Sequence, residues 1–157
     1  FIDYGLYNII NSRKYLTSLG VDALSTSLNG PYLFFKISKS IVPIKQILLN
    51  QTIIAGIGNI YASEILFNAK ISPLRRGKDL KLDHCNKISK SSKTILKKAI
   101  NDGGSSLRDY VATDGTLGNF QNNFKVYDRE GKKISGKIIK KIIQYGRSTY
   151  FCPYIQK

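Results

Sequence analysis

The sequence predicts a mainly α-helical domain followed by a C-terminal β-hairpin. Apolar residues recur at helical spacings in several segments between residues 30 and 100. Two β-prone runs flank a glycine turn near the end of the chain. With 157 residues and 42% hydrophobic content, the chain is long enough for one such domain with its own core.

Two short helices are expected first. Asn29 to Pro31 is a typical helix start with proline in the first turn, and it predicts a helix over about 30–40. After Pro43, apolar residues again recur at spacings of three and four, and this second helix is expected to end near Asn50.

A tight turn and a long helix follow. Gly56 and Gly58 break the chain just before a strongly apolar helical run, which predicts a turn that leads into a helix N-terminus. The segment Leu82–Ile100 is typical of an amphipathic helix, closed by Gly103 and Gly104. Its expected inward residues are Cys85, Ile88, Ile95, Leu96, Ala99 and Ile100.

The end of the chain is predicted to form a β-hairpin. The runs 138–144 and 148–152 are rich in β-prone residues, and Tyr145, Gly146 and Arg147 lie between them. The preceding segment 114–119 contains too little apolar surface for an element of its own and is predicted to be a loop.

The charge indicates a polyanionic partner. Lys and Arg total 25 against 10 acidic residues, a formal charge of +15. Nucleic acid fits better than a membrane, because no apolar run approaches the roughly 18 residues of a spanning helix. The alternative is an AT-rich genome that encodes Lys, Ile and Asn everywhere, so the charge by itself leaves both explanations open.

The two cysteines, Cys85 and Cys152, form neither a local metal motif nor a disulfide framework. They favour a reducing cytoplasm. The chain opens at Phe1 without a methionine or a signal peptide. We therefore expect a cytoplasmic, monomeric fragment of a longer protein.

The turn from Gly56 to Asn59 has the form of an anion site. A helix start presents free backbone N–H groups and the positive end of the helix dipole, and Asn59 can add a side-chain donor. A DNA phosphate would suit these donors. Taken alone the motif is weak, because glycine turns before helices are more often plain connections.

The surroundings of this turn resemble a known family. Segments 44–51 and 55–67 are similar, almost residue for residue, to the helix-two-turns-helix motif of formamidopyrimidine-DNA glycosylases. The similarity continues in family order through 102–110, 114–115 and 126–127. A small-subunit ribosomal protein uses a similar fold to bind RNA, but the matching hairpin and loop favour the glycosylase.

The resemblance implies three parts. Residues 1–28 would be the junction from an N-terminal catalytic domain that this chain lacks. Residues 29–130 would be the helix-two-turns-helix DNA-binding domain, with a lesion-capping loop near 113–120. Residues 131–157 would form a hairpin that corresponds to the zinc finger of the family.

The resemblance also implies how double-stranded damaged DNA is held. Asn59 and nearby backbone amides, including that of Gly58, would hold a phosphate beside the lesion. Lys45 would add a second phosphate contact, and Lys39 is a weaker candidate. Arg147 aligns with the finger arginine, which clamps the phosphates flanking the flipped nucleotide and assists elimination. The alternatives are solvated lysines and an ordinary turn arginine.

Neither a metal nor another cofactor is expected. A structural zinc site needs four thiolate or imidazole ligands, usually in two closely spaced pairs. Only Cys152 of the finger cysteines is present; segment 132–136 stands where the first pair belongs, and Ile155 replaces the last cysteine. The hairpin is therefore expected to be a zincless finger held by apolar packing.

The catalytic residues of the family do not align inside this chain. Its nucleophile is an N-terminal proline, followed by a glutamate that acts as the acid. Ile2 and Tyr4 stand where an arginine and an aromatic residue usually fill the hole left by the extruded base.

The implied function is therefore the damaged-DNA-binding part of a base-excision-repair DNA glycosylase and AP lyase for oxidised purines. This part is expected to be inactive alone. The alternative is a catalytically dead DNA-binding module left by gene truncation.

Overall fold

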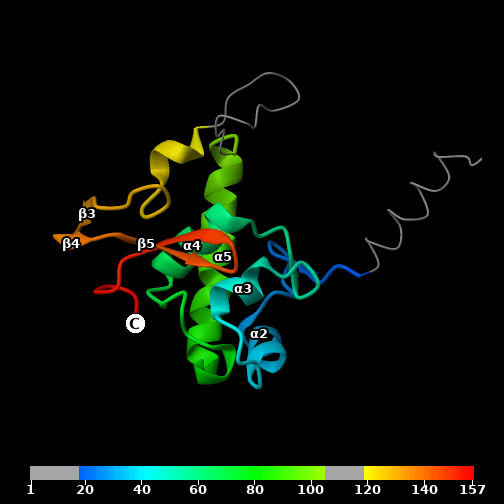
Figure 1. Ribbon diagram of the computed structural model, residues 1–157. Coiled ribbons are helices and arrows are strands. Elements are labelled where there is room, and N and C mark those ends of the chain that lie inside the picture. Colours follow the sequence, from blue (N-terminus) through cyan, green and yellow to red (C-terminus); the bar gives the residue numbers. More distant parts are fainter. Residues whose placement is uncertain (1–17, 105–118) are drawn as a thin grey trace, which may run out of the picture.

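A long central helix organises the fold. In the computed structural model, which describes residues 18–104 and 119–157, helix α5 (Leu82–Asn101) runs through the middle of the molecule (Figure 1). Both α2 and α4 pack against it. The mainly helical fold is confirmed, and its shorter α-helices among the described residues are α2 (Gly30–Ile37), α3 (Ile44–Leu49) and α4 (Asn59–Asn68).

Helix α2 starts where the sequence predicts and ends earlier. The Asn29 side chain accepts a hydrogen bond from the Tyr32 N–H at 2.9 Å, a typical N-cap. The helix ends at Ile37 rather than near residue 40, because the Ser40 N–H turns back to the Ile37 carbonyl and the chain leaves toward Pro43.

Helix α5 is amphipathic as expected, with one exception. Cys85, Ile88, Leu96 and Ala99 are buried, whereas Ile100 is 61% exposed. The prediction that Ile100 points inward is wrong, because it borders an open cavity at the end of the helix instead of packing against another described element.

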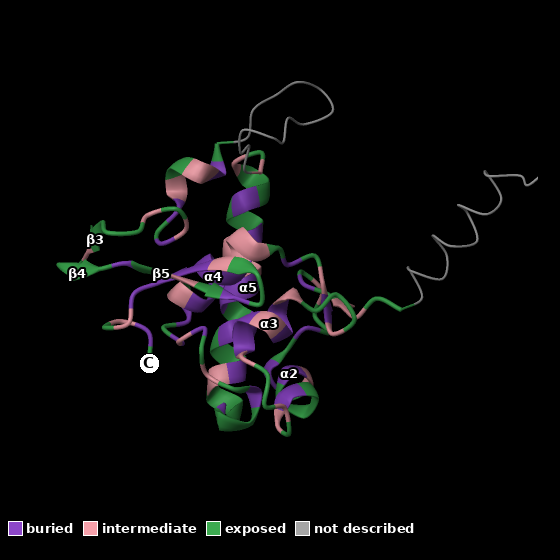
Figure 2. Cartoon of the chain, in the orientation of Figure 1, coloured by how far each residue is buried: buried purple, intermediate pink, exposed green. Residues whose placement is uncertain are grey.

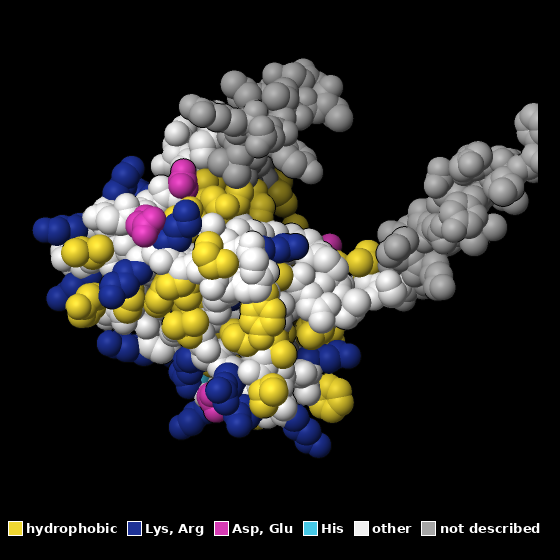
Figure 3. Space-filling view, in the orientation of Figure 1, with side chains coloured by type: hydrophobic (Ala, Val, Ile, Leu, Met, Phe, Trp, Pro, Cys, Tyr) yellow, Lys and Arg dark blue, Asp and Glu magenta, His cyan; other side chains and the backbone are white. Residues whose placement is uncertain are grey.

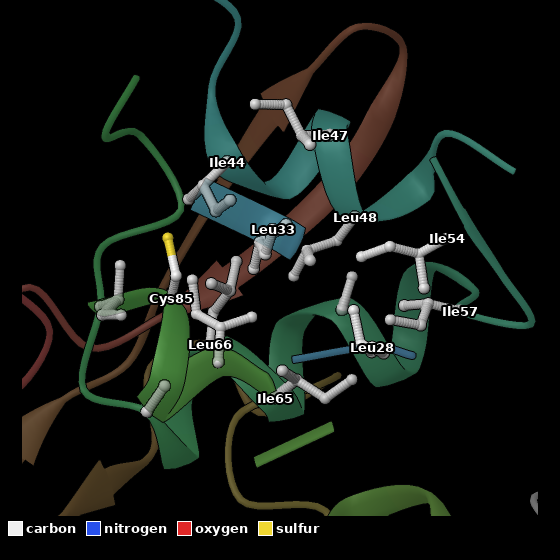
Figure 4. Close-up of a cluster of buried hydrophobic side chains, with 14 of the residues drawn as sticks. Leu28, Leu33, Ile44, Ile47, Leu48, Ile54, Ile57, Ile65, Leu66 and Cys85 are labelled. Carbon is white, nitrogen blue, oxygen red and sulfur yellow. The ribbon is translucent and has the colours of Figure 1, made fainter. Parts of the chain in front are cut away.

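The main core lies where α2, α3, α4 and α5 meet. Figure 4 shows the aliphatic side chains of these elements converging. Each such side chain contributes about 1.5–3 kcal/mol when fully buried. This packing fixes α3 and α4 relative to each other; the fully buried members include Leu33, Ile44, Leu48, Ile65, Leu66 and Cys85.

The strands of the described residues form three separate pairs. The short strand β1 (Val21–Asp22) pairs in parallel with β2 (Ile54–Ala55). The predicted terminal hairpin is confirmed and consists of β5 (Lys140–Gln144) and β6 (Arg147–Phe151), paired antiparallel.

A smaller hairpin was not predicted. It consists of β3 (Lys133–Ile134) and β4 (Lys137–Ile138), and its strands are too short to produce an alternating pattern. Figure 2 shows that this part is mostly exposed, while buried residues gather where α4 and α5 lie.

A chain of aromatic rings attaches the terminal hairpin to the helices. Tyr61 of α4 contacts Phe120, and the contacts continue through Phe124 and Tyr127 to Tyr150 of β6, with centroid separations of 4.9–5.6 Å. An isolated two-stranded hairpin is marginally stable in water, so this packing holds it in place.

The buried carboxylate of Glu64 anchors the segment that precedes the hairpins. It is 1% exposed and accepts the backbone N–H groups of Lys125, Val126 and Tyr127, each at 2.9 Å. Hydrogen bonds to an ionised acceptor are stronger than neutral ones. Glu64 therefore fixes the segment 125–127, which leads into β3, against α4.

Replacing Glu64 tests this anchor. Glu64→Leu leaves three backbone N–H groups without their acceptor, and unfolding in urea at neutral pH should show a loss of more than about 3 kcal/mol. Glu64→Gln, which keeps one acceptor oxygen, should lose less. Glu130→Gln, at an exposed carboxylate, is the control. A loss below about 1 kcal/mol for Glu64→Leu would contradict the assignment.

Candidate nucleic-acid interface

One buried lysine joins three elements. Lys45 in α3 has no exposed surface. Its Nζ donates to Asn59 Oδ1 of α4 at 2.6 Å, to Thr149 Oγ1 of β6 at 2.7 Å and to the Ser148 carbonyl at 3.0 Å. An ammonium group has three protons, and each here has an acceptor. Lys45 therefore ties α3, α4 and the terminal hairpin together.

Two cations lie close together at this junction. Burial, and then the charge of Arg147, lower the pKa of Lys45 from 10.5 to about 8. Arg147 is exposed at the start of β6 and shares a strand face with Thr149, because alternate residues of a strand point the same way. The one ion pair among the described residues joins Lys87 to Asp83. The junction is thus electropositive and suited to an anion.

The Asn59 side chain is held in one orientation. Its oxygen accepts from the Lys45 ammonium, and its Nδ2 donates to the Ser148 carbonyl at 3.1 Å. Only an oxygen can accept from an ammonium group, so the amide cannot be reversed. One Nδ2 proton is left for a further acceptor.

The turn before α4 is shaped by Gln51 and Gly56. The Gln51 side chain accepts the Gly56 N–H at 2.9 Å and donates to the Ile57 carbonyl at 3.0 Å. Gly56 has φ +96°, a conformation that other residues rarely adopt. These two hydrogen bonds and the conformation of Gly56 set the direction in which α4 begins.

Gly58 leaves the N-terminus of α4 open. It is the N-cap residue, and no side chain caps the helix there. Its φ of −98° suits any residue, and a Cβ at this position would meet nothing within 4 Å. The fold therefore does not require glycine here. The open space lets a ligand approach the first backbone N–H groups and the positive end of the helix dipole.

The structure brings together four of the five expected DNA-binding residues. Gly58, Asn59, Lys45 and Arg147 surround one junction. Lys39 is exposed in the turn after α2 and shares no described hydrogen bond with them.

Sequence reasoning did not assign roles to Ser148, Thr149 and Gln51. Ser148 and Thr149 lie 103 and 104 residues from Lys45 in sequence, so no local pattern could have paired them with it. Gln51 lies inside the motif that carries the family resemblance, and this position could have indicated its role.

The finger region does not fit a zinc ion. Cys152 is buried, and no group of three or more metal-binding side chains exists within residues 18–104 and 119–157. Gln156 holds this end of the hairpin instead. Its side chain accepts the Cys152 N–H at 2.8 Å and donates to the Ile71 carbonyl at 2.9 Å. Hydrogen bonds and packing supply the cross-link that four ligands would otherwise provide.

A largely apolar cavity of about 400 Å³ lies beside the start of α4. Tyr61, Ala23 and the C-terminal end of α5 border it. Gly104 also lines it, and its carbonyl accepts the Phe120 N–H at 3.0 Å.

Two expected features lie partly or wholly outside the described residues. Of the expected capping loop near 113–120, residues 113–118 lie outside them, as do Ile2 and Tyr4 of the expected junction.

Lys and Arg side chains are more frequent than acidic ones on the face drawn in Figure 3. They gather at the left of the view, where β3 and β4 lie, and at the bottom, where α2 and the lower end of α5 lie. None of the helices in the described part is long and apolar enough to span a membrane.

Comparison with known proteins places the chain in a family. The model of the formamidopyrimidine-DNA glycosylase H2TH domain matches residues 19–111, more than half of the chain. The chain belongs to the formamidopyrimidine-DNA glycosylase family. The matched range contains α3, the turn before α4, and α4 itself.

Formamidopyrimidine-DNA glycosylases from bacteria are close relatives. The Zymomonas mobilis enzyme is 45% identical over 145 residues, which cover 92% of this chain and 54% of the relative. The Rhodospirillum centenum enzyme is 40% identical over 165 aligned positions, covering all of this chain and 57% of the relative. The chain spans about half the length of the curated relatives it matches.

Solved structures of the family share the fold. MutM (Fpg) from Thermus thermophilus superposes with a TM-score of 0.84 at 37% identity, covering 90% of this chain and 55% of that one. Lactococcus lactis Fpg, in complex with DNA that contains an abasic site, gives a TM-score of 0.84 at 37% identity, covering 96% and 56%.

The pKa of Lys45 predicts a pH dependence of stability. In the unfolded chain the lysine keeps its proton up to about 10.5, whereas in the folded chain it releases it near 8. Between these values unfolding takes up a proton, so the free energy of unfolding rises with pH. The gain is on the order of 3 kcal/mol.

Urea unfolding across this range, with wild type compared with Lys45→Met, isolates the effect from that of other titrating groups. The free energy of unfolding of the wild type, minus that of Lys45→Met, should rise as pH increases from about 8 to 10.5. Lys97→Met, at an exposed lysine of α5, should track wild type. If the free energies of unfolding of the wild type and Lys45→Met changed with pH in parallel, the pKa of Lys45 would not be lowered in the folded protein.

Proposed function

We propose that this chain is the damaged-DNA-binding part of a base-excision-repair DNA glycosylase and AP lyase acting on formamidopyrimidine and 8-oxoguanine lesions. The junction around Lys45 carries the proposal, because it places Asn59, the open end of α4 and Arg147 on one electropositive surface. Membership of the family and the DNA-bound Lactococcus lactis structure support it.

The first phosphate would be held at the start of α4. The remaining Nδ2 proton of Asn59, the Gly58 and Asn59 backbone N–H groups and the helix dipole all favour an oxyanion there. Lys45 would act on the same phosphate through its charge, and by fixing Asn59. Lys39 would add attraction to the same duplex from the exposed turn after α2.

A second phosphate would be held by Arg147. Its guanidinium stays charged at all working pH values and offers a fork of donors that matches two phosphate oxygens. During strand cleavage the departing group is a phosphate, and a fixed positive charge beside it would stabilise the negative charge it carries away. This is the assistance to elimination that we assign to Arg147.

The extruded base would lie against this chain without reacting with it. The apolar cavity beside Tyr61 is suited to an extruded base, and the loop near 113–120 would cover that base. The nucleophile and acid would come from an N-terminal catalytic domain. We propose that the 157-residue chain binds damaged duplex DNA as a monomer in the bacterial cytoplasm and does not cleave it alone.

A catalytically dead DNA-binding module is the second candidate. The presence of a single finger cysteine, Cys152, favours it. A longer protein that contains this chain should form a borohydride-trapped adduct with abasic-site DNA if it is a lyase, and none if it is dead.

Salt-dependent binding tests the proposed phosphate contacts. Arg147→Ala should weaken binding to a duplex with an abasic-site analogue by at least about tenfold. It should also reduce the slope of log K against log salt by about 0.9. Asn59→Ala should weaken binding without changing the slope, because the amide is neutral. Lys97→Ala, at an exposed residue of α5, is the charge-matched control for Arg147.

The proposal is wrong if Arg147→Ala and Asn59→Ala both bind the abasic duplex as tightly as wild type, since the positive charge would then attract any polyanion without a specific clamp.

A further inference from the structure

The tip of the terminal hairpin holds an aromatic residue in an unfavourable backbone conformation. Tyr145 and Gly146 form the two-residue connection between β5 and β6, with φ of +49° and +74°. Positive φ at both central residues defines a type I′ turn, in which the first position favours Asn, Asp or Gly. A bulky side chain is a genuine outlier there.

The other two-residue hairpin turn of this protein shows the contrast. Ser135 and Gly136 connect β3 to β4 with φ of +49° and +73°, nearly the same geometry. A small polar residue takes the first position there. The strain at Tyr145 is therefore a feature of that residue and not of hairpin turns in this chain.

The fold makes no use of the Tyr145 ring. The side chain is 71% exposed, and the described residues offer it neither a hydrogen bond nor a ring contact. By contrast, Tyr61, Tyr127 and Tyr150 pack in the aromatic chain that attaches the hairpin. A strained residue such as Tyr145, whose side chain does not stabilise the fold, indicates a functional role.

The tip lies beside Arg147, the residue proposed to hold the second phosphate, and is fixed in place. Arg147 follows the turn directly, and its strand partner Gln144 is buried and donates to the Pro73 carbonyl at 3.4 Å. Lys45 anchors the next two residues of β6. Ile143, also near the tip, is 65% exposed. An apolar tip thus stands next to the residues that would hold phosphates.

We propose that Tyr145 is a DNA-contact residue, whose ring packs against the sugar and base surface of the duplex beside the phosphate held by Arg147. This inference rests on the proposed function. Aromatic rings bind such surfaces by stacking, which is tolerant of sequence and does not depend on charge. The contact complements the electrostatic clamp and holds the hairpin in register on the duplex.

Tyr145→Asn separates the two roles of the residue, because stability and binding should change in opposite directions. Asn-Gly is the preferred sequence of this turn, so the melting temperature should rise by roughly 1–4 °C. Affinity for a duplex with an abasic-site analogue should fall at least about fivefold. The salt slope should not change, because one neutral residue replaces another. Tyr145→Phe should keep wild-type affinity.

Tyr154→Asn is the matched control, since it removes another exposed tyrosine, 62% exposed, away from the tip. It should bind as wild type. If Tyr145→Asn keeps full affinity while Arg147→Ala loses it, the inference is wrong and the proposed function stands. A lower melting temperature for Tyr145→Asn would also overturn it, because the ring would then be structural. Failure of the proposed function shows separately, as unchanged binding of the Arg147 and Asn59 variants.

Discussion

The arrangement of the binding surface depends on the three hydrogen bonds of the Lys45 ammonium group. Removing a charge from water is costly unless every proton finds an acceptor. Asn59, Ser148 and Thr149 supply those acceptors from two other elements. If the hairpin moved away from α4, the buried charge would lose its partners. The electrostatic cost of Lys45 therefore forces α3, α4 and β6 into one geometry.

Polar anchors and apolar packing hold the hairpin region without a metal. Glu64 binds the backbone at its entry, Lys45 binds β6 near its tip, and Gln156, in the chain after β6, donates to the Ile71 carbonyl. The aromatic chain from Tyr61 to Tyr150 fills the space between them. Each anchor pairs a buried polar side chain with backbone or side-chain groups distant in sequence, which is why the finger keeps its place with one cysteine.

The proposed DNA-contact surface is not optimised for stability. Lys45 and Arg147 repel each other enough to help lower the pKa of the lysine, and Tyr145 occupies a backbone region that disfavours it. An anion at the junction would relieve the first of these conflicts. Local violations of folding rules that cluster at one place are typical of functional sites.

The sequence by itself determined the local elements and the turn that marks the site. Helical spacing predicted α2 to α5, the glycine turn singled out Gly58 and Asn59, and the β-prone runs predicted the terminal hairpin. These features depend on interactions between neighbours in sequence. Tertiary structure decided the rest. A lysine in a sequence is normally a surface charge, and Lys45 is buried only because Thr149, 104 residues away, docks against it. Ile100 is exposed because no described element covers the end of α5, and the strain at Tyr145 follows from a backbone geometry that composition does not show.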